Sequence, residues 1–277
     1  MTMSAPPLGQ HNDMDERLVE HQRIWSEKPT LRTIYMDYHR RLEASCPPGP
    51  ILDIGGGSAH FKNYRADVTS LDILPFPGID VVADAHDMPF EDGRFSGIVM
   101  LDVLHHLQRP VAFLQEAARV LKPGGRLAMI EPGMSVVAKQ FYDRFHQEPV
   151  VMTADPFAEG KQSGDDPFDS NQAIPTLMFA SEQARARVEA TVPALRVVET
   201  CWLGLFAYPL SGGFKSWCLW PAALTGPMIA LEDRLLPALG PLLAFRLMVV
   251  LERRDQDPVV PVRRRAAAGV FSEVYRE

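Results

Sequence analysis

Three consecutive glycines directly after a short apolar run constrain this chain more than any other feature. Residues 51–54 read Ile-Leu-Asp-Ile, and Gly55, Gly56 and Gly57 follow. A short apolar run that ends in turn residues predicts a buried strand of a parallel sheet. Glycine tolerates positive φ and lets a ligand lie against bare backbone. Because residues 58–61 indicate a helix start, the stretch predicts a ligand-binding corner at the carboxyl edge of a sheet.

The residues around the glycines favour a cationic ligand over a phosphate. The dinucleotide-binding pattern G-x-G-x-x-G/A needs a third small residue, but His60 stands there. The phosphate-binding loop needs Lys-Ser or Lys-Thr after the glycines, and neither follows them. Asp53, two residues before Gly55, would repel a pyrophosphate and attract an ammonium or sulfonium group. S-adenosylmethionine (SAM) carries both cations and no phosphate; the alternative is an ordinary turn whose glycines permit tight packing.

The composition suits a globular protein and narrows its partners. Of the 277 residues, 46% are hydrophobic and 23% are charged, and the net charge of −7 does not support a nucleic-acid-binding surface. Cys46, Cys201 and Cys218 form no C-x-x-C pair, so we expect buried, reduced thiols and no metal site. Residues 1–13 do not resemble a signal peptide, and no apolar stretch is long enough to span a membrane. We therefore expect a cytoplasmic protein.

Alternating apolar runs and helical patterns predict a doubly wound α/β sheet. A helical period over residues 15–44 is interrupted at Pro29, which predicts two N-terminal helices. Strands that alternate with helices imply crossover connections and a largely parallel sheet. The predicted strands are residues 51–54, 68–73, 79–83, 94–101, 126–130, 196–206 and 245–252. Two further helices are predicted at residues 110–121 and 181–192.

Five short motifs occur in order between residues 48 and 133. They read Asp-Ile-Gly-Gly-Gly at 53–57, Leu-Asp-Ile at 71–73, Ala-Asp-Ala-His-Asp-Met-Pro-Phe at 83–90, Asp-Val-Leu-His-His-Leu at 102–107 and Arg-Val-Leu-Lys-Pro-Gly-Gly at 119–125. The series resembles the class I SAM-dependent methyltransferases, in the small-molecule and lipid branch (type 11) that includes the quinone C-methyltransferases. The resemblance implies a Rossmann-like seven-stranded sheet, mostly parallel with the last strand antiparallel, and SAM as cofactor. Where the commoner form has a third glycine, this chain has Ala59.

Acidic residues at three successive strand ends are the main candidates for cofactor binding. The resemblance puts Asp53 near the ammonium group of SAM, while Asp72 can accept hydrogen bonds from both ribose hydroxyls. Ile73 would pack on the adenine, Asp84 would accept from its amino group, and the Ala85 N–H would donate to a ring nitrogen. For each aspartate the alternative is a helix cap or a solvated turn. The predicted cofactor residues are Asp53, Gly55, Gly56, Gly57, Asp72, Ile73, Asp84, Ala85 and Leu101.

His105, His106 and Glu131 are the candidate catalytic residues. All three follow predicted strands at the carboxyl edge of the sheet. Methyl transfer is an in-line displacement that needs alignment, and a base helps where the acceptor is a hydroxyl or an acidic carbon. Because His-His recurs in this motif among enzymes with different substrates, a structural role is the alternative. Tyr142 and His146 are further candidates. The sequence lacks the Asn-Pro-Pro-aromatic run and the Pro-Cys pair typical of nucleobase methyltransferases.

Two insertions are expected to choose the methyl acceptor. Residues 149–180 are polar and rich in turn formers, which predicts a long functional loop. Residues 211–244 are strongly apolar but contain four prolines, so we expect short helices joined by bends. We interpret this second insertion as a lid in which Trp217 and Trp220 contact the acceptor; a dimer contact or plain packing is the alternative. An apolar lid favours a lipid, an isoprenoid or an aromatic metabolite as acceptor.

The chain is expected to form one methyltransferase domain with two flanking segments. Residues 1–47 would be a tail and helical leader, residues 48–252 the domain, and residues 253–277 a C-terminal tail. The basic cluster at 263–265 suits peripheral contact with anionic lipid. The expected partner is a small-molecule acceptor rather than a nucleic acid. The alternative function is a SAM-binding protein without transfer activity that acts as a regulatory partner. The sequence leaves the acceptor, the methylated atom and the oligomeric state open.

Overall fold

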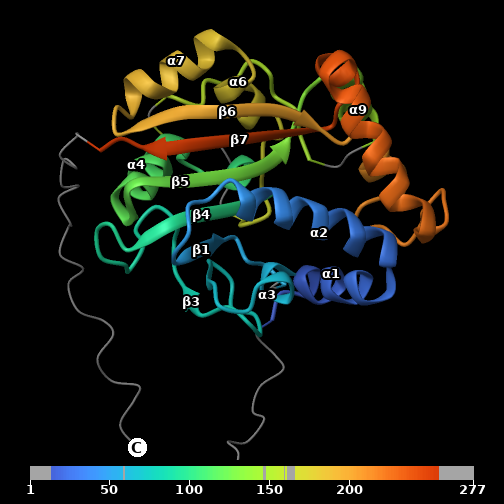
Figure 1. The fold of residues 1–277 in the computed structure, drawn as a ribbon, viewed down its shortest axis with the longest axis horizontal. Helices are drawn as coiled ribbons and strands as arrows, with labels where there is room; N and C mark the ends of the chain where they lie inside the picture. The colour runs from blue at the N-terminus through green and yellow to red at the C-terminus, as the bar shows by residue number, and fades with distance from the viewer. Residues whose placement is uncertain (1–13, 59, 146–147, 159, 161–165, 256–277) are drawn as a thin grey trace, which may run out of the picture.

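A seven-stranded sheet organises the protein in the computed structural model, which describes residues 14–58, 60–145, 148–158, 160 and 166–255. The strand order is β3-β2-β1-β4-β5-β7-β6 (Figure 1). The strands are β1 (Ile51–Ile54), β2 (Thr69–Asp72), β3 (Val81–Val82), β4 (Phe95–Leu101), β5 (Leu121–Pro132), β6 (Leu195–Leu203) and β7 (Arg246–Arg253). β7 runs antiparallel to both β5 and β6, and the other pairings are parallel. The predicted fold class is confirmed.

Helices cover both faces of the sheet. The helices of one face are α4 (Pro110–Val120), α6 (Ile174–Phe179) and α7 (Glu182–Thr191). Those of the other face are α1 (Glu16–Glu27), α2 (Pro29–Ala44), α3 (His60–Tyr64) and α9 (Thr225–Leu243). The 3₁₀ turn η1 (Leu104–His106), α5 (Val136–Phe145) and α8 (Ala207–Ser211) follow the carboxyl ends of β4, β5 and β6, and η2 (Ala222–Leu224) leads into α9. The carboxyl edge therefore carries most of the irregular structure.

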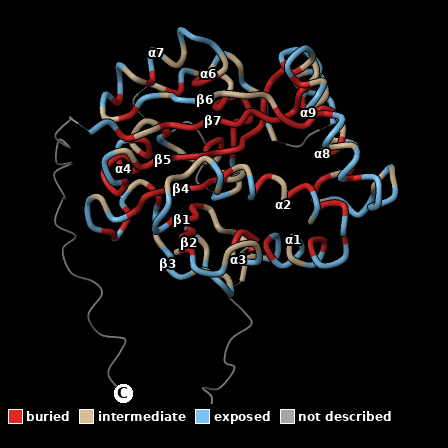
Figure 2. The backbone as a smooth tube through the Cα atoms, viewed as in Figure 1, coloured by how far each residue is buried: buried red, intermediate tan, exposed pale blue. Residues whose placement is uncertain are grey.

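Alternation of side chains lets each central strand serve both helical layers. In β5, Leu127 and Met129 pack with α4 and α6, whereas Ala128 and Ile130 pack with α2. All four are fully buried, and Figure 2 shows the central strands as the most buried part of the molecule. A strand covered on both faces reads as a continuous apolar run, which is why these strands were recognisable in the sequence.

The N-terminal helices and the strand ends follow the predictions closely. α1 ends at Glu27 and α2 begins at Pro29, as the break in the helical period indicated. Proline is well tolerated at the first helical position, because that residue's N–H has no partner within the helix. Several strands differ in length from the prediction: β2 has four residues and β3 has two, β5 begins at Leu121, and β6 ends at Leu203.

The predicted loop at residues 149–180 ends in a helix, α6. Its six residues are mostly apolar, and Ile174, Met178 and Phe179 are fully buried against the α4 layer. A run this short has no recognisable helical period, so burial rather than local pattern determines its conformation.

The prediction of short helices in the second insertion is wrong for residues 225–243, which form the single helix α9. Pro237 and Pro241 lie inside it, although an interior proline costs about 3 kcal/mol. The face of α9 that carries Leu236 and Gly240 packs on the sheet, and a Cβ at Gly240 would lie 2.8 Å from the Cβ of Trp202. Tertiary packing of this face overrides the local proline signal.

Within the described residues, none of the helices combines the length and the apolar composition that crossing a membrane requires. The basic cluster at 263–265 lies outside the described residues, so peripheral membrane contact stays a prediction. The division of the chain near residues 47 and 252 also stays a prediction.

α9 anchors the start of α8 through a buried carboxylate. Glu232 accepts hydrogen bonds from the backbone N–H groups of Phe206 and Ala207, both at 2.5 Å. Burial raises the pKa of Glu232, while these hydrogen bonds act in the opposite direction. α9 thereby fixes the segment that leads from β6 toward the cavity described below.

We expect Glu232→Leu to lower the free energy of unfolding by about 1–3 kcal/mol for each N–H left without an acceptor. Asp233→Leu is the matched control, because this neighbouring carboxylate forms a surface ion pair with Arg41. Such a pair contributes about 0–1 kcal/mol. Urea unfolding of both variants measures the difference, and equal losses would contradict the anchoring role.

Candidate functional site

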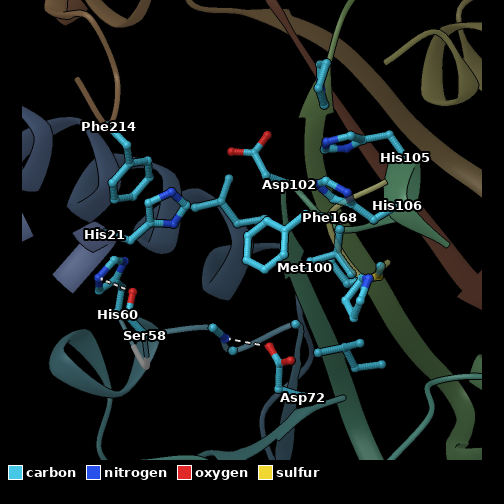
Figure 3. A pocket seen from close by; sticks show the side chains of 18 of the residues that line it. His21, Ser58, His60, Asp72, Met100, Asp102, His105, His106, Phe168 and Phe214 are labelled. Carbon is cyan, nitrogen blue, oxygen red and sulfur yellow. Dashed lines mark hydrogen bonds between the residues drawn. The ribbon is translucent and has the colours of Figure 1, made fainter. Parts of the chain in front are cut away.

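A cavity of about 900 Å³ opens at the carboxyl edge of the sheet, beside the glycine corner. This volume lies within the usual range for small-molecule sites. Its floor is formed by the ends of β1, β2 and β4, and its rim by α1, residues 166–168 and residues between 208 and 217. In Figure 3, His105 and His106 lie together on one side, His21 and Phe214 on the other, and Asp72 at the floor.

The glycine corner has a backbone that only glycine adopts easily. Gly55 has φ +68° and Gly57 has φ +49°. A Cβ at Gly55 would overlap the side chain of Val103. The N–H of Gly57 donates to Asp72 Oδ2 at 2.7 Å, a bond drawn in Figure 3. The corner therefore presents bare backbone to the cavity and is tied to the end of β2.

Two buried carboxylates lie under the corner. Asp72 accepts hydrogen bonds from the N–H groups of Gly57 and Leu74, and Asp53 accepts one from the Ser70 hydroxyl at 3.0 Å. Burial raises the pKa of Asp53 to about 7; the Ser70 hydrogen bond opposes the rise and the charge of Asp72 adds to it. Burial also raises the pKa of Asp72. A cation bound beside Asp53 would favour its ionised form.

All nine predicted cofactor residues line this one cavity. Asp84 is more open than the other two aspartates, and its Oδ1 accepts from the backbone and ring N–H groups of His86 at 2.9 and 2.6 Å. Ile73 presents an apolar side chain that is 53% exposed. An exposed isoleucine beside buried polar groups offers a flat apolar surface to a ligand ring.

Two of the three predicted catalytic residues face the cavity, and the third stands behind them. The rings of His105 and His106 lie 4.1 Å apart on η1. Glu131 is fully buried and is not among the described residues that line the cavity. Its carboxylate accepts from His105 Nδ1 at 2.7 Å and from the N–H groups of Val103 and Leu104 at 2.9 and 2.8 Å. Glu131 therefore orients His105 rather than meeting a substrate.

Electrostatics separate the two histidines. Burial disfavours charge on His105, but its hydrogen bond to Glu131 and the nearby carboxylates outweigh burial, and the net result is a raised pKa. Burial and the charge of His105 lower the pKa of His106 to about 4. Of the further candidates, Tyr142 lines the cavity, while His146 lies outside the described residues.

An ion pair that the sequence did not reveal lies in the cavity wall. Asp102 is the only non-glycine residue with positive φ in the described part of the chain. Its carboxylate accepts from both terminal nitrogens of Arg246 and lies 3.4 Å from the Tyr35 hydroxyl. The Arg246 side chain is buried, and its guanidinium carbon lies 4.0 Å from the centre of the Tyr208 ring. Such strained backbone is typical of functional sites.

The rim joins three segments that are far apart in the sequence. The ring of His21 on α1 stacks on Phe214 with centroids 4.4 Å apart. Arg17 lies 3.8 Å over the Phe168 ring and forms a 2.8 Å ion pair with Asp166. Residues of α1 therefore form part of the cavity's rim, and the loop at 149–180 contributes to the same rim.

Only the N-terminal end of the predicted lid lines the cavity, and a lid role for it stays a prediction. Within residues 211–244, the residues that line the cavity all lie between 212 and 217. Trp217 is among them; Trp220 instead packs with the α2 layer, and α9 lies away from the opening. One face of α9, with Leu236 and Gly240, packs on the sheet, whereas Leu231 and Leu242 on the same helix are 46% and 49% exposed.

Comparison with known proteins points to one family. Residues 52–129 match the family model described as "Methyltransferase domain". A probable phthiotriol/phenolphthiotriol dimycocerosates methyltransferase 2 from Mycobacterium ulcerans is 36% identical over 103 residues, which cover 32% of this chain and 38% of that protein. A demethylmenaquinone methyltransferase from Tropheryma whipplei is 35% identical over 97 residues, 29% of this chain and 41% of that protein. The matched regions thus span about two fifths of these relatives.

A solved structure extends the similarity of fold across most of the chain. It is a SAM-dependent methyltransferase from Thermotoga maritima, described as a possible histamine N-methyltransferase. The TM-score is 0.52 at 14% sequence identity, and the match covers 86% of this chain and 98% of that one. The likeness supports the fold.

The Lys28 side chain holds the rim segment in place. Its ammonium donates to the carbonyl oxygens of Gly213, Lys215 and Trp217 at 2.7, 2.7 and 3.0 Å. Hydrogen bonds from a charged donor are worth about 1.5–3 kcal/mol. Because Lys28 is the one residue between α1 and α2, these bonds couple the leader to the rim.

We expect Lys28→Met to speed hydrogen exchange of the amides at 212–217 by about tenfold or more. The opening that exposes these amides to solvent would no longer have to break the Lys28 hydrogen bonds. Lys62→Met, which removes a surface ion pair with Asp80, is the control and should leave these amides unchanged. Exchange that is equally slow in both variants would show that Lys28 does not hold the rim.

Proposed function

Because this chain belongs to the class I SAM-dependent methyltransferases, we propose that it transfers a methyl group from SAM to a small apolar or amphipathic acceptor. One observation carries the proposal: a single cavity combines the nine predicted cofactor residues with a histidine wall and a set of aromatic side chains. An enzyme of this kind needs cofactor and acceptor in one enclosed space, so that the reacting atoms are aligned and water is excluded.

The residues at the corner fit SAM. Bare backbone at Gly55 and Gly57 admits the methionine portion, and the buried Asp53 supplies a carboxylate for its ammonium group. Asp72 already accepts one backbone N–H on each oxygen, and its remaining lone pairs can accept the ribose hydroxyls. Ile73 offers its exposed surface to the adenine. Asp84 and the Ala85 N–H supply an acceptor and a donor for the edge of that ring.

The acceptor compartment is aromatic, which supports an apolar acceptor. Phe141, Tyr142, Phe145 and Phe245 line the cavity, and the rings of Phe141 and Phe245 lie 5.3 Å apart. Aromatic walls favour ligands with an apolar body. The named relatives include a phthiotriol/phenolphthiotriol dimycocerosates methyltransferase and a demethylmenaquinone methyltransferase, and lipid or isoprenoid acceptors of this kind would suit the compartment.

The chain's own residues orient the acceptor. SAM, when bound, supplies a methyl group on a sulfonium that an acceptor can displace in line. His105 faces the cavity in a fixed ring orientation, because Glu131 holds its Nδ1 from behind. His106 lies beside it, and together they present imidazole nitrogens to the acceptor's reactive end. The rim of His21, Phe168 and Phe214 limits the access of water.

Calorimetry followed by a methyl-release assay tests the proposal. SAM and S-adenosylhomocysteine (SAH) should each bind one site per chain, and S-adenosylhomocysteine should accumulate when a cell extract supplies acceptors. Binding without release from any extract would favour the alternative of a SAM-binding regulatory protein. Absence of binding would overturn both.

Asp72→Ala should weaken SAM binding by about 1.5–3 kcal/mol, because it removes a charged acceptor from two ribose hydroxyls. Asp84→Ala should weaken it less, since the Asp84 side chain is 49% exposed. Isothermal titration measures both, with the exposed Asp87→Ala as the control. Unchanged affinity in the Asp72 variant would mean that the ribose lies elsewhere.

SAM affinity should rise with pH through the titration of Asp53. The pKa of Asp53 is raised to about 7, so much of this carboxyl is protonated below neutrality. The positive charges of SAM favour the ionised form of Asp53, so SAM binding below neutrality must release the proton of this carboxyl. Between pH 5.5 and 7 we expect the affinity to increase by up to about tenfold per pH unit. Asp53→Asn should abolish this slope; a slope that persists would assign it to another group.

His105→Gln should lower kcat by about 10²–10⁴-fold, the range expected when a general acid or base is lost. The affinity for SAM should stay unchanged. His106→Gln tests its neighbour in the same assay. Losses below tenfold for both would leave the two histidines as packing residues.

A further inference from the structure

We propose that His105, His106 and Glu148 bind a divalent transition-metal ion at the acceptor end of the cavity. One ligand atom from each residue lies within 4.8 Å of the other two. His105 Nε2 and Glu148 Oε2 are 3.7 Å apart. Ligands about 2.0–2.2 Å from one Zn²⁺ are roughly 3–3.5 Å apart, so small side-chain adjustments would complete the site. All three residues line the cavity.

A hydrogen bond at Nδ1 sets the tautomer of each of the two rings. His105 Nδ1 lies 2.7 Å from Glu131 Oε2, and His106 Nδ1 lies 3.3 Å from the carbonyl oxygen of Asp169. Both partners can only accept here. The Glu131 carboxylate already accepts from two backbone N–H groups, and the Asp169 carbonyl oxygen has no proton to donate. Each Nδ1 must therefore carry the proton, which assigns the lone pair to Nε2. A carboxylate behind a histidine is the usual support of a metal-binding imidazole.

Glu148 is held at the cluster by polar neighbours. Its Oε2 accepts from the Ser170 hydroxyl at 2.7 Å and from the side-chain amide of Gln172. Gln172 is 97% buried, and its Oε1 is one of three buried side-chain atoms without a hydrogen-bond partner in the described part of the chain. Buried polar atoms normally have partners. The orphaned amide oxygen, on a residue that lines the cavity and contacts Glu148, is accounted for by an ion or its bound water.

A shared proton explains the cluster less well than an ion. If His105 were doubly protonated between Glu131 and Glu148, both of its nitrogens should lie within about 2.7–3.2 Å of a carboxylate oxygen. The Glu131 side meets this condition at 2.7 Å, but the Glu148 side does not at 3.7 Å. The 3.7 Å between His105 Nε2 and Glu148 Oε2 is closer to the separation of two ligands bound to the same metal ion.

The donor set selects the class of ion and of acceptor. Two imidazole nitrogens and one carboxylate suit Zn²⁺, Fe²⁺ or Co²⁺, whereas Mg²⁺ and Ca²⁺ prefer oxygen ligands throughout. Three protein ligands leave positions for a ligand from the cavity.

Resting on the proposed function, we infer an acceptor with a phenol or enol oxygen. As that oxygen binds the ion, its proton leaves to solvent. The resulting anion, through oxygen or a conjugated carbon, bonds to the methyl carbon while the C–S electron pair stays on sulfur.

The sequence analysis expected no metal site, and no local pattern indicates this one, because Glu148 follows His106 by 42 residues. The fold brings them together where the segment after α5 returns past η1.

Titration of the purified full chain with Co²⁺, followed by its visible absorption, tests the site. We expect one Co²⁺ per chain, and at least about tenfold weaker binding in each of His106→Ala and Glu148→Gln. Glu182→Gln, an exposed carboxylate in the first turn of α7, is the matched control and should bind Co²⁺ as the native chain does. Excess Mg²⁺ should not compete.

Glu131→Gln adds a test of the positioning role. The amide NH₂ that replaces one carboxylate oxygen would donate to His105 Nδ1 and so place the ring proton on Nε2, which then cannot coordinate. We expect Co²⁺ affinity to fall by about 10–100-fold, as is usual when the support of a metal-binding histidine is removed.

Calorimetry with S-adenosylhomocysteine on every variant separates the possible failures. Equal Co²⁺ affinity in the native chain and in the His106→Ala/Glu148→Gln double variant, with S-adenosylhomocysteine bound by both, would overturn the metal site and leave the proposed function standing. Loss of S-adenosylhomocysteine binding by the native chain would overturn the proposed function instead, whatever Co²⁺ does.

Discussion

The hydrogen bond from the Gly57 backbone to the Asp72 carboxylate joins the two strand ends on which the cavity is built. It requires a buried carboxylate at the end of β2 and a backbone with positive φ after β1, and each holds the other in place. Burial of that carboxylate beside Asp53 is costly, since both pKa values are raised. A cofactor with two positive charges and two hydroxyls offsets this cost when it binds, so the corner is suited to SAM before any ligand arrives.

The second half of the cavity depends on buried carboxylates of a different kind. Glu131 fixes His105 from behind, and Asp102 holds Arg246 in the wall. Neither pair is close in sequence, and each joins β4 or its following turn to β5 or β7. Rigid side chains thus line the acceptor end, while the rim above them is assembled from α1 and two loops through ring stacking and the Lys28 hydrogen bonds.

The cofactor end could be predicted from sequence because its chemistry is local to strand ends. Strands of a parallel sheet end at one edge, so Asp53, Asp72 and Asp84 had to lie near one another once the strands were recognised. The acceptor end could not be predicted in the same way. Asp102 and Arg246 are 144 positions apart, and no local pattern indicates that they pair. The prolines of α9 misled the prediction, because packing of Leu236 and Gly240 on the sheet outweighs their local preference.

A crystal structure of the chain with S-adenosylhomocysteine tests whether cofactor and acceptor occupy the two ends of one cavity. We expect ribose hydroxyls on Asp72, adenine against Ile73, and the sulfur atom directed toward the compartment of His105 and the aromatic side chains. S-adenosylhomocysteine bound with its sulfur turned away from that compartment, or bound outside this cavity, would contradict this assignment.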